Sequence, residues 1–156
     1  LQDALMTKKI NLYTFKQLFK NFLKNYSNLN RKTGFKYNNI SMNTILLDND
    51  KLVLYDFENS TDNTLYKKIS KLKEPKNIYN TKISNFTSSN NEVLKLKKEN
   101  HDIICILLLI NYCEKILNKY PIQIYLNKED NDILNSTDEL FEKLKYIMNM
   151  DYFKTL

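Results

Sequence analysis

Gly34 is the only glycine among the 156 residues of this chain. Loops that cradle the phosphates of nucleotides need several glycines, because a Cβ atom would keep successive backbone N–H groups away from a phosphate. The sequence therefore excludes a Walker loop, a Rossmann turn and any other Gly-rich phosphate loop within these residues. Gly34 stands just after an amphipathic pattern, where a helix commonly ends in a left-handed residue.

Apolar residues recur with helical spacing in three parts of the chain. Residues 12–29 carry the three-and-four spacing of an amphipathic helix that we expect to end near Gly34. Residues 101–117 are apolar on all sides, which predicts a central, buried helix. Ser136 is followed three residues later by Glu139, a capping-box pattern that predicts the start of a last helix. The apolar residues on one face of that helix are Leu140, Phe141, Leu144, Ile147 and Met148.

Two short apolar runs, 44–47 and 52–55, flank an Asp/Asn-rich turn and predict a β hairpin. Residues 58–100 are rich in Ser, Thr, Asn and Lys and show weak periodicity, so we expect them to be mostly loop. The predicted fold class is therefore mainly α with a small β hairpin.

Lysine dominates the charge of the chain, which is +6 overall. Residues 66–98 carry nine Lys and two Glu, and such a segment could bind phosphate backbones electrostatically. A basic nucleic-acid-associated protein is therefore one functional hypothesis. Arg31 is the only arginine, so guanidinium contacts are nearly absent, and the Lys and Asn usage is typical of an AT-rich gene. A solvated loop is the favoured interpretation.

The cysteines and the length of the apolar runs indicate the cellular compartment in which the chain is expected. Cys105 and Cys113 fall eight residues apart in one predicted helix, about 12 Å along its axis, which is too far for a disulfide. We expect two core thiols in a reducing, intracellular and cytoplasmic setting. The longest apolar run, 103–110, is far short of the roughly 20 residues that span a bilayer. His101 is expected at the surface of a helix start, and one His with two Cys predicts no zinc site.

Four motifs follow one another along the chain. Residues 34–48 read Gly-Phe-Lys-Tyr-Asn-Asn-Ile-Ser-Met-Asn-Thr-Ile-Leu-Leu-Asp, and residues 55–58, after the hairpin, read Tyr-Asp-Phe-Glu. Residues 91–94 read Asn-Glu-Val-Leu, and residues 102–107 read Asp-Ile-Ile-Cys-Ile-Leu. In this order they resemble the C-terminal lobe of the protein kinase-like superfamily. The Asp-Phe-Glu variant looks like that of choline kinase and aminoglycoside phosphotransferase relatives.

The resemblance implies one kinase-like C-terminal lobe over residues 1–156. Its parts would be a lead and amphipathic helix to residue 33, a catalytic-loop-like segment and hairpin over 34–57, an activation-segment-like loop over 58–100, and a helical core over 101–156.

The resemblance also assigns site residues, in two alternative registers. The position of the catalytic Asp falls on Asn39 when counted from the hairpin and on Asn38 when counted back from Asp56. Either way it is an amide, which neither takes a proton at neutral pH nor carries negative charge. Asp56 would be a Mg²⁺ ligand, with Thr44 or Asn43 as the second.

Two further residues would be structural by the same resemblance. Asp102 would anchor the backbone of the catalytic-loop-like segment, or else cap its helix. Glu92 would pair with a late Arg, but no Arg follows Arg31, so this ion pair is missing or is made by Lys.

These departures favour a catalytically inactive, pseudokinase-like lobe without a cofactor, serving as a scaffold or regulatory protein-binding module. The alternative is a divergent ATP-dependent phosphotransferase that uses Mg-ATP and whose N-terminal lobe lies on an upstream segment or a partner chain. In both cases we expect an exposed apolar top of the lobe, covered by a protein partner or by the missing N-terminal lobe.

Overall fold

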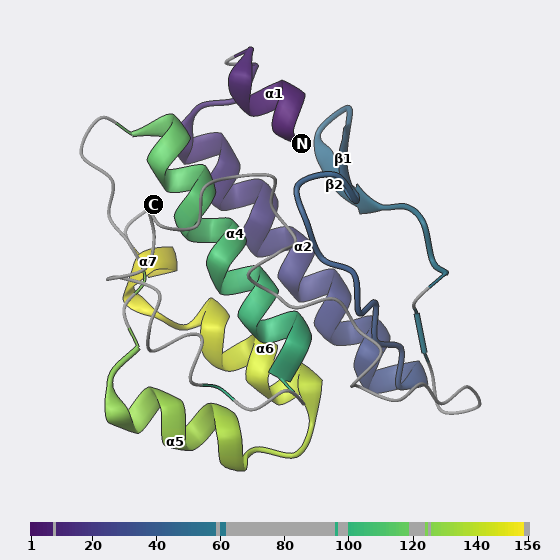
Figure 1. Cartoon of the computed structure of the whole chain (residues 1–156), viewed down its shortest axis with the longest axis vertical. Helices are drawn as coiled ribbons and strands as arrows, with labels where there is room; N and C mark the ends of the chain where they lie inside the picture. The colour runs from purple at the N-terminus through teal and green to yellow at the C-terminus, as the bar shows by residue number, and fades with distance from the viewer. Residues whose placement is uncertain are drawn as a thin grey trace.

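The computed structural model describes residues 1–7, 9–58, 60, 61, 96, 100–118, 124 and 126–154. It is mainly helical, with one two-stranded antiparallel sheet (Figure 1), so the predicted class of mainly α with a hairpin is confirmed. The elements are α1 (Gln2–Met6), α2 (Leu12–Thr33), β1 (Ile45–Asp48), β2 (Lys51–Leu54), α4 (His101–Leu117), α5 (Lys128–Ser136), α6 (Leu140–Met148) and α7 (Asp151–Lys154).

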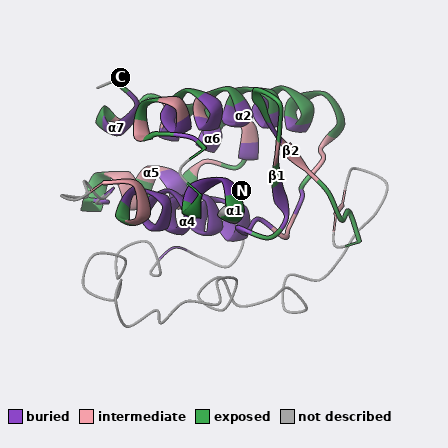
Figure 2. Cartoon of the chain, turned by 90° about the horizontal axis from the view of Figure 1, so that it is seen from above, coloured by how far each residue is buried: buried purple, intermediate pink, exposed green. Residues whose placement is uncertain are grey.

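The helices form two layers. Figure 2 shows α2, α6 and α7 in one layer and α4 and α5 in the other, with their buried sides facing inward. The hairpin and α1 lie at the opposite end of the molecule from α5 (Figure 1). Within the described part of the chain, none of the helices combines the length and apolarity needed to cross a membrane.

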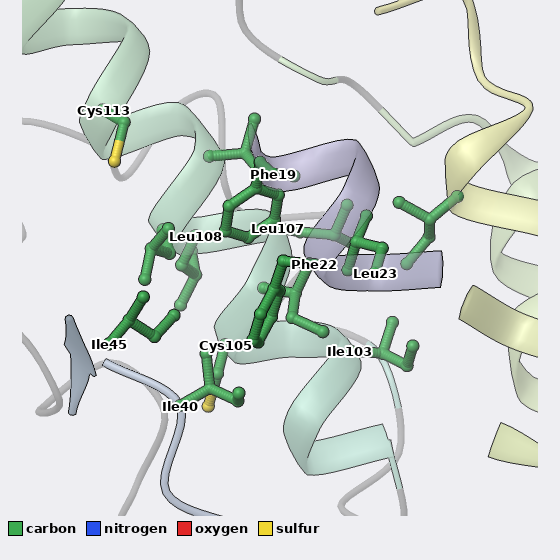
Figure 3. Packing of buried hydrophobic residues seen from close by; sticks show 14 of the residues in the cluster. Phe19, Phe22, Leu23, Ile40, Ile45, Ile103, Cys105, Leu107, Leu108 and Cys113 are labelled. Carbon is green, nitrogen blue, oxygen red and sulfur yellow. The ribbon is translucent and has the colours of Figure 1, made fainter. Parts of the chain in front are cut away.

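The central helix α4 has the bounds predicted from the sequence, and it is buried from His101 to Glu114. Its apolar side chains pack against the aromatic face of α2. Figure 3 shows Phe19 and Phe22 of α2 beside Leu107 of α4, and all three are buried. The all-round apolarity of this segment therefore reflects a helix with neighbours on every side.

The long helix α2 begins and ends as its sequence predicts. The Asn11 side chain caps its start by accepting a hydrogen bond from the Thr14 backbone at 2.8 Å. Gly34 ends it with a left-handed backbone, φ 72°, and donates its N–H to the Asn30 carbonyl at 2.7 Å.

Replacing Gly34 with Ala is expected to lower the free energy of unfolding by about 1 kcal/mol, because a Cβ atom disfavours this left-handed conformation. Gly34→Asn should lower the free energy of unfolding by less, since Asn tolerates positive φ. Urea denaturation of the two variants checks the order. Equal losses would show that φ is not the cause.

The hairpin pairs Ile45 with Leu54 and Leu47 with Leu52, so its strands are each shifted by one residue from the predicted runs. Ile45 and Leu52 face the core and are buried. Since successive residues of a strand alternate between faces, the Leu46 side chain points away from the core.

The capping box predicted at Ser136 and Glu139 is wrong. Ser136 is the last residue of α5, and Glu139 precedes α6 without a side-chain capping bond. The capping box belongs to α5: Asp130 N–H donates to Asn127 Oδ1 at 2.8 Å, and Asn127 N–H donates to Asp130 Oδ2 at 3.0 Å. The Asn-x-x-Asp pattern of this box satisfies the same two donors as the Ser-x-x-Glu pattern. The predicted last helix itself is present as α6.

The expectation that His101 lies at the surface is also wrong, because the first turn of α4 is inside the molecule. The His101 ring lies 3.7 Å from the Asp102 carboxylate and 3.8 Å from the Cys105 sulfur. Cys105 and Cys113 are buried and not joined in a disulfide, as predicted, and burial raises the pKa of both well above the usual value.

Candidate functional site

The backbone of the segment Phe35–Asn38, directly after α2, is held by side chains of α2. Asn30 Nδ2 donates to the Phe35 carbonyl at 2.8 Å, and the Tyr26 hydroxyl accepts the Tyr37 N–H at 2.8 Å. Tyr26 and Asn30 are one helical turn apart and therefore lie on the same face of α2. Both side chains are buried, and the contact of Tyr26 with the Tyr37 N–H is buried as well.

Asp102, in the first turn of α4, holds the same segment from the other side. Its two carboxylate oxygens accept the Asn38 N–H at 3.0 and 3.2 Å, and one of them also accepts the Tyr26 hydroxyl. Burial, reinforced by the negative charge of Asp102, raises the pKa of Tyr26 well above its usual value. The phenol therefore remains a neutral donor. Asn100, not Asp102, stands at the cap position of α4.

A third clamp comes from residues 60–61. Lys36 and Thr61 exchange two backbone hydrogen bonds, of 2.8 and 2.9 Å. The Asn38 side-chain amide donates to Thr61 Oγ1 at 3.1 Å. Asn38 itself has φ 64°, a conformation that Asn adopts more readily than most residues. Phe35–Asn38 is thus an irregular segment whose backbone is fixed from three directions, and we call it the anchored segment.

The turn that leads from the anchored segment into β1 is closed by Thr44. Its hydroxyl donates to the Asn39 carbonyl at 2.6 Å and accepts the Ser41 N–H at 3.0 Å. Thr44 is buried, whereas Asn43 is exposed. The two candidates for the second metal ligand thus differ: the Thr44 hydroxyl is hydrogen-bonded within the turn, whereas the Asn43 side chain reaches solvent.

Asp56 follows the hairpin and is exposed, with φ 64°. Its carboxylate accepts the Glu58 N–H at 3.4 Å. Tyr37 links this region to the anchored segment, because its hydroxyl donates to the Tyr55 carbonyl. Burial raises the pKa of Tyr37, and the negative charge of Asp56 raises it further.

The chemistry open to this site is limited by its donors. Asn38 and Asn39, the two candidates for the catalytic position, are both partly buried amides that offer no proton acceptor at neutral pH. Within the described residues, no three or more His, Cys, Asp or Glu side chains lie close enough together to hold a metal ion. Asp56 with the Asn43 amide could contribute only part of an oxygen ligand set, the rest of which Mg²⁺ usually takes from water and phosphate.

Sequence reasoning missed Tyr26, Asn30 and Thr61, which carry much of the anchoring. One signal for Asn30 was present: it is a polar residue in phase with the apolar stripe of α2, where a buried side chain needs a hydrogen-bond partner. Glu92 and nearly all of the Lys-rich segment lie outside the described residues.

Comparison with known proteins found no matching family model, no matching curated protein and no matching solved structure.

Proposed function

We propose that this chain is a protein kinase-like C-terminal lobe that has lost catalysis and serves as a protein-binding scaffold. One observation carries the proposal: Asp102, at the start of the central helix, accepts the backbone N–H of Asn38 from 64 residues earlier in the sequence. This is the role that the resemblance assigns to that carboxylate. The segment it holds carries an amide at each candidate position for the catalytic Asp.

The chemistry of phosphoryl transfer supports the loss of catalysis. The reaction requires metal ions on the phosphates, a Lys on the nucleotide and a carboxylate that orients the attacking hydroxyl. Asn38 and Asn39 supply no such carboxylate, and Gly34 is the only glycine that could belong to a phosphate loop. Among the candidate catalytic and metal positions, Asp56 retains the residue type of the family in both registers.

Retained anchoring together with lost chemistry favours a role in binding. The hydrogen bonds of Tyr26 and Asp102 orient the backbone around Asn38 whether or not a proton is transferred there. A segment so fixed presents the neighbouring surface in one conformation, which reduces the ordering cost when a partner binds.

Mg-ATP is expected to leave the melting temperature of the full chain unchanged, because the described site lacks the groups that hold a nucleotide. A ligand present at about 100 times its Kd would add about 2.7 kcal/mol to the stability of the folded state, which a thermal shift detects easily. Asp56→Ala is the test variant. Asp132→Ala is its matched control, because Asp132 is also an exposed carboxylate but lies on α5.

A reproducible stabilisation by Mg-ATP that disappears in Asp56→Ala but persists in Asp132→Ala would contradict the proposal. It would favour the alternative, a phosphotransferase that obtains its nucleotide lobe from an upstream segment or a partner chain.

A further inference from the structure

The outer face of the β hairpin carries apolar side chains, exposed Leu46 among them, beside the exposed cross-strand pair Asp48 and Lys51. Leu46 and Val53 lie opposite each other in the two strands, on the face away from buried Ile45 and Leu52. Leu46 is 42% exposed, and Tyr55, two residues beyond Val53 on the same face, is 46% exposed. Diagonal neighbours across a hairpin are close enough for an aromatic ring to touch an aliphatic side chain. We define Leu46, Val53 and Tyr55 as the hairpin face.

Phe57 adds an exposed ring where the chain leaves the hairpin. One side of the ring packs on Phe35 and Tyr37, with ring centroids 6.1 and 5.8 Å apart, yet 55% of its surface is exposed. Both Phe35 and Tyr37 belong to the anchored segment. The Phe57 ring therefore rests on a fixed support.

The side chains of residues 44–58, which contain the hairpin, carry a net charge opposite in sign to that of the whole chain. Residues 44–58 contain four carboxylates and one ammonium group, a net charge of −3, whereas the chain as a whole carries +6. All five charged side chains are exposed. They are Asp48, Asp50, Lys51, Asp56 and Glu58. An apolar surface flanked by carboxylates is complementary to a segment in which basic residues flank apolar ones.

We propose that the hairpin face docks a basic segment of a partner protein, whose apolar side chains cover Leu46, Val53 and Tyr55 and whose Lys or Arg side chains meet the flanking carboxylates. The proposal rests on the scaffold function proposed above and names the class of partner. A two-fold contact with a second copy is disfavoured, because it would place the same carboxylates against each other. Anionic lipid headgroups and nucleic-acid phosphates are disfavoured by the same charge.

The test measures fluorescence anisotropy of labelled synthetic peptides with the full chain. The probe alternates Leu and Lys, and two control peptides alternate Leu with Glu and Ser with Lys. The Leu/Lys peptide is expected to bind, and both controls are expected to bind at least about tenfold more weakly, since each lacks one half of the complementarity. Binding should also weaken with added salt, which screens the exposed carboxylates.

Two double variants locate the binding. Leu46→Ser with Tyr55→Ser removes apolar surface, and Asp48→Asn with Asp50→Asn removes charge. Each double variant is expected to weaken binding of the Leu/Lys peptide by about tenfold or more. The Tyr55 substitution leaves its backbone carbonyl in place, so the bond from Tyr37 remains possible. Circular dichroism of each variant confirms that it is folded.

Matched controls lie elsewhere on the molecule. Leu29→Ser on α2 removes an aliphatic side chain of nearly equal exposure, 44%, and Asp132→Asn with Asp138→Asn removes two exposed carboxylates in and after α5. Neither control should change the affinity.

The outcomes separate this proposal from the scaffold function. Three results would each overturn the docking proposal, even if Mg-ATP has no effect. They are no binding of the Leu/Lys peptide, equal binding of the Leu/Glu peptide, and equal affinity for the Leu/Lys peptide in the hairpin and control variants. Docking at the hairpin face combined with Asp56-dependent stabilisation by Mg-ATP keeps the docking site and overturns the inactive scaffold.

Discussion

Asp102→Ala is expected to lower the free energy of unfolding by about 3 kcal/mol, because it leaves the buried Tyr26 hydroxyl and the partly buried Asn38 N–H without their acceptor. An unsatisfied buried donor costs about 1–3 kcal/mol, and the Tyr26 hydroxyl is the more deeply buried of the two donors. Urea denaturation of the full chain measures the loss.

Two variants distinguish the lost hydrogen bonds from the lost volume. Asp102→Asn retains one acceptor oxygen and most of the shape, so its loss should be about 1 kcal/mol. Tyr26→Phe removes only the bridging hydroxyl, and combined with Asp102→Ala it should cost less than the sum of the two single losses, because both act on one network. A strictly additive pair, or a loss below about 1 kcal/mol for Asp102→Ala, would contradict the anchoring described above.

Phe19→Ala is expected to cost about 4 kcal/mol, because it removes a fully buried ring between α2 and α4 and leaves a cavity that the packed helices cannot close. The ring also contacts Phe15 and Phe22, with centroids 5.4 and 5.5 Å away, so aromatic contacts are lost with it. The denaturant midpoint and the slope of unfolding report the effect.

Tyr13→Ala is the matched control on the same helix, since it removes an aromatic side chain that is 56% exposed and should change stability by less than about 1 kcal/mol. Phe19→Leu, which refills most of the volume, should recover part of the loss. A loss in Phe19→Ala no larger than that in Tyr13→Ala would mean that the core does not depend on this ring.

The parts of the fold that follow local rules could be predicted from the sequence. The bounds of α4 follow from an unbroken apolar segment, and the end of α2 follows from Gly34, since helical periodicity and a left-handed C-terminal residue are encoded within a few positions. The hairpin was displaced by only one residue, because its Asp/Asn turn lies between two apolar runs.

Local patterns failed where one helix runs on into the signal predicted for the next. Ser136 is still the last residue of α5 and so does not cap α6, whereas Asn127 and Asp130 form the box at the start of α5. His101 was misplaced for a related reason: the position of a helix start relative to the rest of the chain is a tertiary property.

The candidate site was predictable only in part. Asp102, Asp56 and the Asn residues were singled out by residue type and order. The partners of Asp102 were not, since Asn38 is 64 residues away and Tyr26 is 76 residues away, and no spacing rule reaches that far. Tyrosine hydroxyls on an apolar helix face also look like ordinary core residues until a partner is seen.

The anchored segment links the opening of a loop to that of the helices that hold it. The Tyr37 and Asn38 amides belong to no helix or strand, yet the acceptor of the Tyr37 amide lies on α2 and that of the Asn38 amide lies on α4, so each amide is expected to exchange with solvent only when the segment leaves the helix that holds it. We therefore expect these two loop amides to exchange more slowly than those of an unanchored loop. The support beneath Phe57 would then last as long as its hydrogen bonds to the two helices.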